Sequence, residues 1–258
     1  MISLEETAQL FKQLHKPGQP LVLANVYDGI SAREVAKSPT SKALATASYA
    51  IAQAHNTTDD DLDLETNLRA CKTIADVARE FQKPLTVDLQ DGYGDRLEEA
   101  VSRLVKMGVV GINLEDYDKT ARELYSVETA TARIRQALAA AAAQGLTNFV
   151  VNARCDGLLH GRDLSEVISR GKAYLAAGAT TVFVWGRRSR TTSRQEVETL
   201  VEAFGGKLNV SLKASKDRLS IKQLAEIGVA RISTGPLLQF MAMKYYGREA
   251  RTLLRQAI

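Results

Sequence analysis

Short apolar runs alternate with amphipathic segments along almost the whole chain. Runs of strand type begin at Leu21, Ala43, Leu85, Val109, Phe149, Thr181, Leu208 and Ala230. Between them lie segments whose apolar residues recur at helical spacing, the clearest of which runs from Glu65 to Phe81. The pattern predicts eight strands separated by helices. Strands that are joined by helical crossovers run parallel to one another.

Eight parallel strands close naturally into one (β/α)8 barrel, which is the fold we expect for residues 1–258 as a single domain. A helix with a Ser3 and Glu6 capping box precedes the first strand, and a short helical tail, interrupted by Gly247, follows the last. No linker rich in proline, glycine or serine divides the chain. A doubly wound open sheet is the alternative, but no glycine-rich phosphate turn follows the first predicted strand.

Composition excludes several classes of protein and partner. The 34 basic and 30 acidic residues are interspersed, so no concentrated basic face indicates a nucleic-acid partner. No apolar run approaches the roughly 20 residues of a membrane span, and the N-terminus lacks the apolar region of a secretory signal. Cys71 and Cys155 are the only cysteines, which suits a reducing compartment. We therefore expect a cytoplasmic protein without a membrane partner.

Polar residues stand where the predicted strands end. The carboxyl ends of all strands of a barrel open on the same face, so these residues converge there. The members of this set are Ser48, Asp88, Gln90, Glu115, Arg154 and Lys213. The sharpest signal is the stretch 84–94, in which a short strand breaks into Asp88, Gln90 and Asp91 and then turns at Gly92 and Gly94. We expect the active site here.

Acids on neighbouring strands favour a cation site. Asp88 and Glu115 lie on consecutive predicted strands, and Gln90 adds an amide oxygen. Mg²⁺ prefers a few such oxygens together with waters, so the sequence predicts Mg²⁺ or Mn²⁺ between these residues. Arg154 is suited to a substrate carboxylate or phosphonate through its planar, bidentate guanidinium. Its alternative role is a salt bridge to Glu115, and the two roles are compatible.

Other polar residues have competing interpretations. Lys213, at the end of a strand, is placed to form a Schiff base with a ketone substrate. The basic group of Arg187, Arg188, Arg190 and Arg194 either attracts an anionic substrate or forms a solvated loop. We expect His15, His55 and His160 to be solvated and Cys155 to be a buried, inert thiol.

The strand ends resemble the isocitrate lyase/phosphoenolpyruvate mutase superfamily from Leu21 to about Pro236. Stretch 88–94 resembles its Asp-x-Asp-x-Gly-Tyr-Gly motif, stretch 111–116 its Gly-x-x-x-Glu-Asp motif, and stretch 153–156 its Ala-Arg-x-Asp motif. Residues 48–50 resemble the loop after its second strand, and stretches 208–210 and 231–235 resemble its last two strands.

The resemblance implies a role for each matching residue. The backbone amides of Ser48, Tyr49 and Ala50 would hold the substrate's carboxylate and carbonyl oxygens, and Arg154 and Asn209 would bind the substrate. Asp88 would contact Mg²⁺, with Gln90 beside it and Glu115 as an acid of the metal's shell. Asp60 would act in the outer shell of the metal or in catalysis. The family's reactions share an enolate of a 2-oxo acid, and we expect this chain to form a homo-oligomer, a dimer or a tetramer.

Two departures from the family pattern shape the expected reaction. Gln90 replaces the second aspartate, and the expected lid, residues 117–125, lacks the cysteine motif of the isocitrate lyases. We expect Mg²⁺-dependent cleavage of a C–C bond in a small 2-oxo or 2-hydroxy diacid such as oxaloacetate. The alternatives are P–C chemistry on phosphonopyruvate or phosphoenolpyruvate, and a silent barrel that only binds a 2-oxo acid. Water, Tyr49, Tyr93 or a lid group would protonate the enolate.

Overall fold

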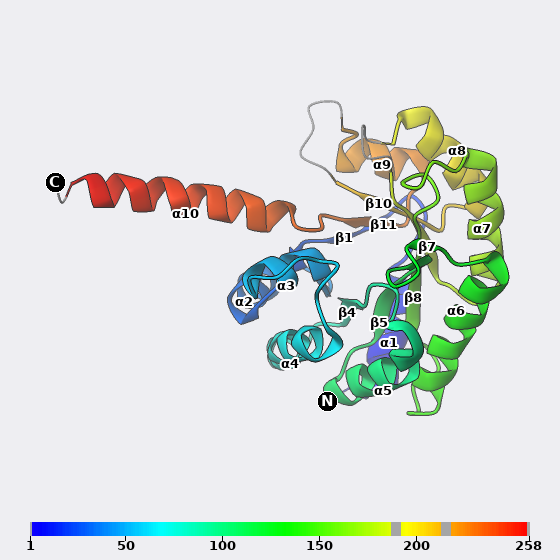
Figure 1. Cartoon of the computed structure of the whole chain (residues 1–258), viewed down its shortest axis with the longest axis horizontal. Helices are drawn as coiled ribbons and strands as arrows, with labels where there is room; N and C mark the ends of the chain where they lie inside the picture. The colour runs from blue at the N-terminus through cyan, green and yellow to red at the C-terminus, as the bar shows by residue number, and fades with distance from the viewer. Residues whose placement is uncertain (1, 187–191, 213–217, 257–258) are drawn as a thin grey trace.

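The chain forms a closed parallel barrel in the computed structural model, which describes residues 2–186, 192–212 and 218–256 (Figure 1). Lys213 and the arginines at 187, 188 and 190 lie outside the described residues. The strands of the main sheet are β1 (Leu21–Leu23), β2 (Asn25–Val26), β3 (Leu44–Thr46), β4 (Leu85–Asp88), β5 (Gly111–Glu115), β8 (Val150–Cys155), β9 (Thr181–Val184), β10 (Leu208–Ser211) and β11 (Arg231–Ser233).

The sheet closes through its first strand. The sheet order is β1-β11-β10-β9-β8-β5-β4-β3-β2, and every printed pair in it is parallel. β1 pairs with the last strand and β2 pairs with β3, yet only Ala24 separates these two segments along the chain. Segments β1 and β2 therefore act as one interrupted strand, so the nine segments make eight barrel strands. The predicted (β/α)8 barrel is confirmed.

Helices surround the barrel and begin at capped positions. They are α1 (Leu4–Gln13), α2 (Gly29–Lys37), α3 (Ser48–Ala54), α4 (Leu64–Glu80), α5 (Leu97–Met107), α6 (Val127–Ala142), α7 (Leu164–Ala176), α8 (Arg194–Phe204), α9 (Ile221–Ile227) and α10 (Leu237–Arg255). The predicted capping box at Ser3 is present, and a short 3-10 turn, Gly94–Arg96, precedes α5. The apolar faces of the helices and the outer strand faces form one buried core. None of the helices in the described ranges is long and apolar enough to cross a membrane.

Alternation along the strands separates an apolar outer face from a polar interior. In β5, Ile112 and Leu114 belong to the core between strands and helices, whereas Asn113 and Glu115 alternate with them. The strand register places Asp88 beside Asn113, and Asn113 beside Asn152. Barrel interiors are usually filled by branched apolar side chains. Here the interior is polar directly below the site.

Two segments differ from the sequence-based expectation. The tail is one uninterrupted helix, α10, which continues through Gly247 and projects away from the barrel, with the C-terminus at its far end (Figure 1). Residues 117–125, the expected lid, contain a small antiparallel hairpin that the sequence analysis did not predict, formed by β6 (Tyr117–Asp118) and β7 (Glu123–Leu124). The hairpin strands are too short to show an alternating pattern, which is why the sequence did not reveal them.

Candidate active site

A pocket of about 370 Å³ opens where the strands end. Its walls contain residues from β2, β4, β5, β8, β9, β10 and β11, together with the first residues of α3 and the base of α10. Three of the predicted strand-end residues, Ser48, Asp88 and Arg154, line this single pocket. The convergence that the barrel topology predicts is therefore present for these residues.

The turn after β4 is built by residues with positive φ. Gly92 and Gly94 have φ values of 85° and 62°, and Gln90 and Tyr93 adopt similar angles of 55° and 59°. A Cβ atom on Gly92 would lie 2.6 Å from Leu97 Cδ1, so glycine is required there both for space and for conformation. Left-handed backbone at two non-glycine residues costs free energy, which is a common feature of functional turns.

Asp88 has one satisfied carboxylate oxygen and one free one. The backbone N–H and the hydroxyl of Ser48 donate to Asp88 Oδ2 at 3.1 and 3.2 Å. Ser48 begins helix α3, so the loop expected at residues 48–50 is instead the first turn of a helix. Asp88 Oδ1 is buried and has no hydrogen-bond partner in the described part of the chain. A buried, unpaired carboxylate oxygen is costly unless it has a ligand.

The acid that joins Asp88 in the pocket is Asp59. Asp59 lines the pocket, whereas Asp60 is exposed and does not line it. Burial and the nearby Asp88 carboxylate both raise the pKa of Asp59. The resemblance singled out Asp60 from a run of three aspartates, and the run has no periodicity that distinguishes its members. Whether Asp60 acts in the outer shell of a metal remains a prediction.

Gln90 holds Asp59 in place. Its Nε2 donates to the backbone carbonyl of Asp59 at 2.7 Å and to Asp59 Oδ1 at 2.8 Å. The Gln90 side chain is buried and is not among the residues that line the pocket. Its Oε1 atom is also without a partner among the described residues. Gln90 therefore orients an acid of the site, and its predicted contact with a cation remains a prediction.

Arg154 is held by two carboxylates and an aromatic ring. Its Nε and Nη2 donate to Asp156 at 2.7 and 3.0 Å, and its Nη1 pairs with Glu115 Oε1 at 2.5 Å. The guanidinium lies 4.7 Å from the centre of the Trp185 ring. The predicted salt bridge to Glu115 is present, and Arg154 still lines the pocket. Three of five N–H donors are used, so two remain for a bound anion.

Burial and neighbouring charges shift the pKa values of both members of the Arg154–Glu115 ion pair. Burial raises the pKa of Glu115, and Arg154 works against that effect. Burial alone would lower the pKa of Arg154, but Asp156 and Glu115 outweigh it and raise this pKa. Arg154 is therefore a permanent cation at the edge of the pocket, fixed in orientation by its two acids.

The acids suit a Mg²⁺ ion that keeps waters and substrate oxygens. No group of three or more histidine, cysteine, aspartate or glutamate side chains that could enclose an ion is found in the ranges that the structure describes. Mg²⁺ commonly binds one or two carboxylates and completes its octahedron with water and substrate. The free Asp88 Oδ1 and the neighbouring Asp59 match that limited set. The residues present therefore fit a divalent ion.

The remaining predicted site residues occupy different positions. Tyr49 lines the pocket, and its ring centre lies 5.7 Å from that of Phe240. The Tyr93 hydroxyl accepts a hydrogen bond from Asn67 at 2.9 Å, and burial raises its pKa. Ala50 is buried in α3, and Asn209 is buried beneath the pocket, where it donates to Ser233. Their roles in proton transfer and substrate binding remain predictions.

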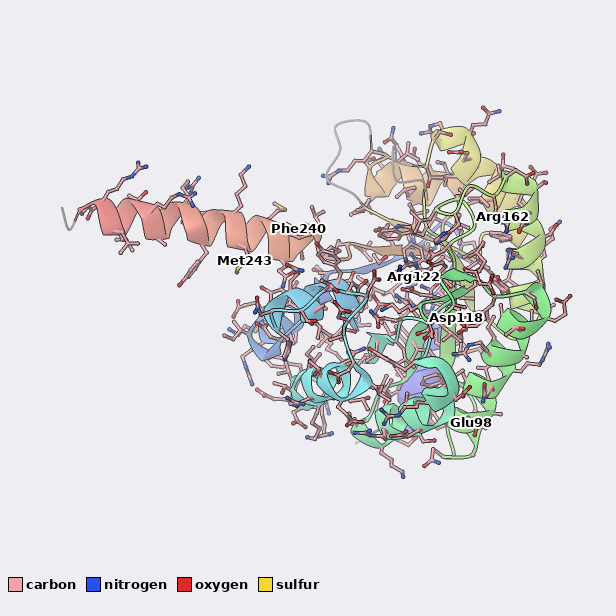
Figure 2. The ribbon with its side chains drawn as sticks, in the orientation of Figure 1. Glu98, Asp118, Arg122, Arg162, Phe240 and Met243 are labelled. Carbon is pink, nitrogen blue, oxygen red and sulfur yellow. The ribbon has the colours of Figure 1, made fainter. Side chains whose placement is uncertain are left out.

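The hairpin β6–β7 is hydrogen-bonded to the backbone of Asp59, one of the acids that line the pocket. Lys119 Nζ donates to the backbone carbonyl of Asp59 at 2.7 Å, and the Tyr117 ring stacks on His160 with their centres 4.2 Å apart. Figure 2 labels Asp118, the last residue of β6, and Arg122, which directly precedes β7. The role of residues 117–125 as a lid remains a prediction.

Sequence reasoning missed several residues that line the pocket. Asn113, Phe183, Ser211 and Ser233 all belong to barrel strands and face the pocket. The available signal was a polar residue at alternate positions within apolar runs, as in the sequence Gly-Ile-Asn-Leu-Glu of β5.

Comparison with known proteins agrees with this architecture. The family model described as phosphoenolpyruvate phosphomutase matches residues 11–254. A solved structure of a proposed phosphonomutase from Burkholderia cenocepacia is 34% identical, covers 97% of this chain and 99% of its own, and superposes with a TM-score of 0.87. Oxaloacetate decarboxylase 1 of Pseudomonas fluorescens is 26% identical over 99% of this chain and 89% of its own.

A third similarity concerns a ligand-bound structure. A phosphonopyruvate hydrolase that was solved with oxalate and Mg²⁺ is 22% identical, covers 97% of this chain and 87% of its own, and superposes with a TM-score of 0.84. At that identity the similarity shows the fold alone. The family model, which spans most of the chain, carries the assignment: the chain belongs to the phosphoenolpyruvate phosphomutase family.

Proposed function

We propose that this protein is a Mg²⁺-dependent enzyme that cleaves a C–C bond of a small 2-oxo or 2-hydroxy diacid such as oxaloacetate, through an enolate. The observation that carries the proposal is the pocket itself. An unpaired Asp88 oxygen, a fixed Arg154 cation and the Ser48 N-terminus of α3 all border one cavity at the strand ends. Anion and cation binding groups side by side suit a small, doubly charged substrate.

Each group has a defined task in this proposal. Asp88 and Asp59 would hold the ion, which when bound stabilises negative charge on the substrate's oxygens. Arg154 would orient the charged end of the substrate by a charge-assisted hydrogen bond. The backbone amides at the start of α3 would donate to the carboxylate and carbonyl oxygens. The hairpin at residues 117–125 would exclude water, and Tyr49, Tyr93, a lid group or a water would deliver the proton.

P–C bond chemistry on phosphonopyruvate or phosphoenolpyruvate is the second candidate. It is favoured by the 34% identity to a proposed phosphonomutase over almost the whole of both chains. The C–C reaction is favoured by a named oxaloacetate decarboxylase that matches 99% of this chain. A third possibility is a barrel that binds 2-oxo acids without converting them, since the family's lid motifs are absent from residues 117–125.

A substrate panel distinguishes the three. The purified protein would be incubated with Mg²⁺ and, separately, oxaloacetate, phosphonopyruvate, 2-methylisocitrate or 2,3-dimethylmalate, and followed by proton and phosphorus NMR. We expect enzymatic conversion of oxaloacetate or a close diacid. Conversion of phosphonopyruvate alone would establish the second candidate. Binding of oxalate, an enolate mimic, without conversion of any compound would indicate a binding barrel and contradict the proposal.

We further propose that the partner of α10 is a second copy of this chain, giving a dimer or tetramer. Only Gln239 of this helix is buried, where its Nε2 donates to the carbonyl of Ala50. Large apolar side chains elsewhere on the helix are exposed: Leu238, Phe240, Met241, Met243, Tyr245, Tyr246, Leu253 and Leu254. Phe240 lies near the barrel and Met243 farther along the helix (Figure 2). An apolar helix of this kind is stable in water when another surface covers it.

A further inference from the structure

A buried arginine crosses the interior of the barrel beneath the pocket. Arg231 lies on β11 and is only 1% exposed. Its Nη2 donates to Asn113 Oδ1 on β5 at 3.1 Å. β11 and β5 are four positions apart in either direction around an eight-stranded barrel, so they face each other across it. The long arginine side chain therefore spans the interior and connects opposite walls.

The hydrogen-bond partners of Arg231 are neutral. No carboxylate in the described ranges lies within ion-pair distance of it, and its Nε is buried without a hydrogen bond to any described group. Burial lowers the pKa of Arg231 to about 9, and the charge of Asp88 opposes this effect only in part. On its other side, Nη1 lies 3.4 Å from His15 Nε2. His15, expected to be solvated, is half-buried there, and burial and Arg231 lower its pKa to about 3. Burying a cation without an acid is costly, so this arrangement calls for a functional explanation.

The arginine fixes the orientation of two amides. A guanidinium only donates, so the Asn113 atom that faces it is the oxygen. Asn152 Nδ2 donates to the same Asn113 Oδ1 at 2.9 Å, and Asn152 Oδ1 in turn accepts from the Thr181 hydroxyl at 2.6 Å. Asn113 is consequently held with its oxygen toward the barrel interior and its NH₂ group on the other side.

The NH₂ group of Asn113 has no other assigned task. Asn113 lines the pocket and is 8% exposed, and no described residue accepts a hydrogen bond from its Nδ2. Asp88 is its register neighbour on β4, but Asp88 Oδ1 has no partner and Oδ2 is bound by Ser48. The amide is therefore a donor at the floor of the pocket, available to a ligand that brings an acceptor oxygen.

We propose that Asn113 binds the substrate by donating a hydrogen bond to one of its anionic oxygens, and that Arg231 is the positioning residue that fixes the Asn113 amide for this contact. The inference rests on the proposed function in one respect only, the use of a small dianion with carboxylate or enolate oxygens as the ligand. It adds to that proposal a donor on the pocket floor and a cation that acts through it.

Oxalate binding tests the role of Asn113 without requiring turnover. Calorimetric titration of oxalate in the presence of Mg²⁺ would be compared for the wild type, Asn113→Ala and Asn113→Asp. A hydrogen bond to a charged group predicts a loss of affinity of about 10- to 100-fold for Asn113→Ala. Asn113→Asp keeps the acceptor for Arg231 but lacks the donor, so it should bind oxalate at least as poorly while remaining folded. Asn148→Ala, whose amide instead donates to Glu5 far from the pocket, is the matched control and should bind normally.

A double-mutant cycle tests the role of Arg231. Arg231→Met removes the charge at similar length, and because the buried cation lacks an acid, we expect the thermal unfolding midpoint to change little. Oxalate affinity should nevertheless fall about 3- to 10-fold, roughly the effect of misorienting one amide. In the Asn113→Ala background the same change should have no further effect. An additive loss would overturn the positioning role.

The outcomes separate this inference from the proposed function. If oxalate binds the wild type and the variants weaken it, but no substrate is converted, the reaction is wrong and the inference stands. Equal oxalate affinity in the wild type and Asn113→Ala would overturn the inference even if oxaloacetate is cleaved. Failure of the wild type to bind oxalate with Mg²⁺ would also overturn it, because the donor would then have no dianion to meet.

Discussion

At the scale of single residues, Arg154 combines a structural role with a proposed binding role. Replacing it by alanine would leave Glu115 and Asp156 buried and unpaired, at a cost of roughly 3–5 kcal/mol of stability, which would obscure any effect on activity. Arg154→Lys keeps the positive charge but lacks the planar fork that matches a carboxylate. We expect Arg154→Lys to lose roughly 2 kcal/mol or more of transition-state stabilisation. This corresponds to a fall in kcat/KM on the best substrate of at least about 30-fold.

Arg170→Lys is the matched control for this prediction. Arg170 is another buried arginine with acidic partners, Asp116 and Glu166, but it does not line the pocket. Its replacement should affect the unfolding midpoint and leave kcat/KM near the wild-type value. Arg154→Lys with near-normal kcat/KM would show that the guanidinium is purely structural and that another group orients the substrate.

The raised pKa of Asp59 predicts that the stability of the metal-free protein depends on pH. Burial and Asp88 raise its pKa in the folded state, so folding favours its protonated form. That contribution to stability is complete below the ordinary aspartate pKa and is lost as pH rises through the raised value. In EDTA, Asp59→Asn should therefore unfold at nearly the wild-type temperature near pH 4 and at a higher temperature than the wild type at pH 7. Each kcal/mol corresponds to roughly 2–4 °C for a chain of this size.

Two comparisons make the Asp59 measurement specific. Asp60→Asn alters the exposed neighbour and should give no comparable pH-dependent difference. Adding Mg²⁺ should reduce or reverse the advantage of Asp59→Asn, because an ion beside Asp88 would favour the charged carboxylate. A difference between Asp59→Asn and the wild type that stays constant from pH 4 to pH 7 would contradict the assignment of Asp59 to the buried acidic pair.

Single residues were predictable where they interrupt a pattern. Asp88 and Arg154 follow apolar runs, and the barrel topology alone brings them to one face. Asp59 was missed in favour of Asp60 because a run of aspartates in a loop gives no directional signal. Asn113 was missed because a polar residue inside a short strand is visible as a site only when the position of the strand in the barrel is known.

At the scale of elements, a helix could be predicted from the sequence where one of its faces is buried against the core. The helix α4 was predicted to within a residue at each end, because its apolar stripe faces the core. The helix α10 was expected to be interrupted at Gly247, since glycine is unfavourable in a helix by about 1 kcal/mol relative to alanine. The structure has no break there. The apolar residues of α10 face outward, so the sequence pattern gave no sign of what they pack against.

The exposed apolar side chains of α10 predict that the protein forms oligomers. Light scattering coupled to size-exclusion chromatography should give the mass of a dimer or tetramer for the wild type. Met241→Glu combined with Tyr245→Glu places two charges one turn apart on α10 and should shift the protein toward the monomer, since burying an unpaired charge is strongly unfavourable. Circular dichroism should show that the barrel remains folded.

Arg251→Glu on the same helix is a charge-matched comparison, because it changes the net charge by the same amount as the double substitution. It should disturb the assembly less, as it removes no apolar side chain. A monomeric wild type, or an unchanged mass for the double variant, would contradict the proposal that a second copy covers α10.

At the scale of the whole molecule, topology does most of the predictive work. Once eight alternating strands and helices imply a parallel barrel, the polar strand ends must meet at one opening. The closure through β1 and β2, the continuous α10 and the polar interior around Arg231 depend on three-dimensional packing. No sequence period encodes these features, which is why the outline of the site was accessible from the sequence and its floor was not.

The central claim is that Asp88 binds the ion that makes this barrel an enzyme for a small 2-oxo diacid. The most direct measurement is the NMR-monitored rate of oxaloacetate conversion against Mg²⁺ concentration, for the wild type, for Asp88→Asn and for a blank without protein. We predict a saturable Mg²⁺-dependent rate above the blank that EDTA abolishes. In Asp88→Asn, which keeps an acceptor for Ser48, that rate should fall to the blank. Wild-type conversion that persists in EDTA, or equal rates for the wild type and Asp88→Asn, would contradict the claim.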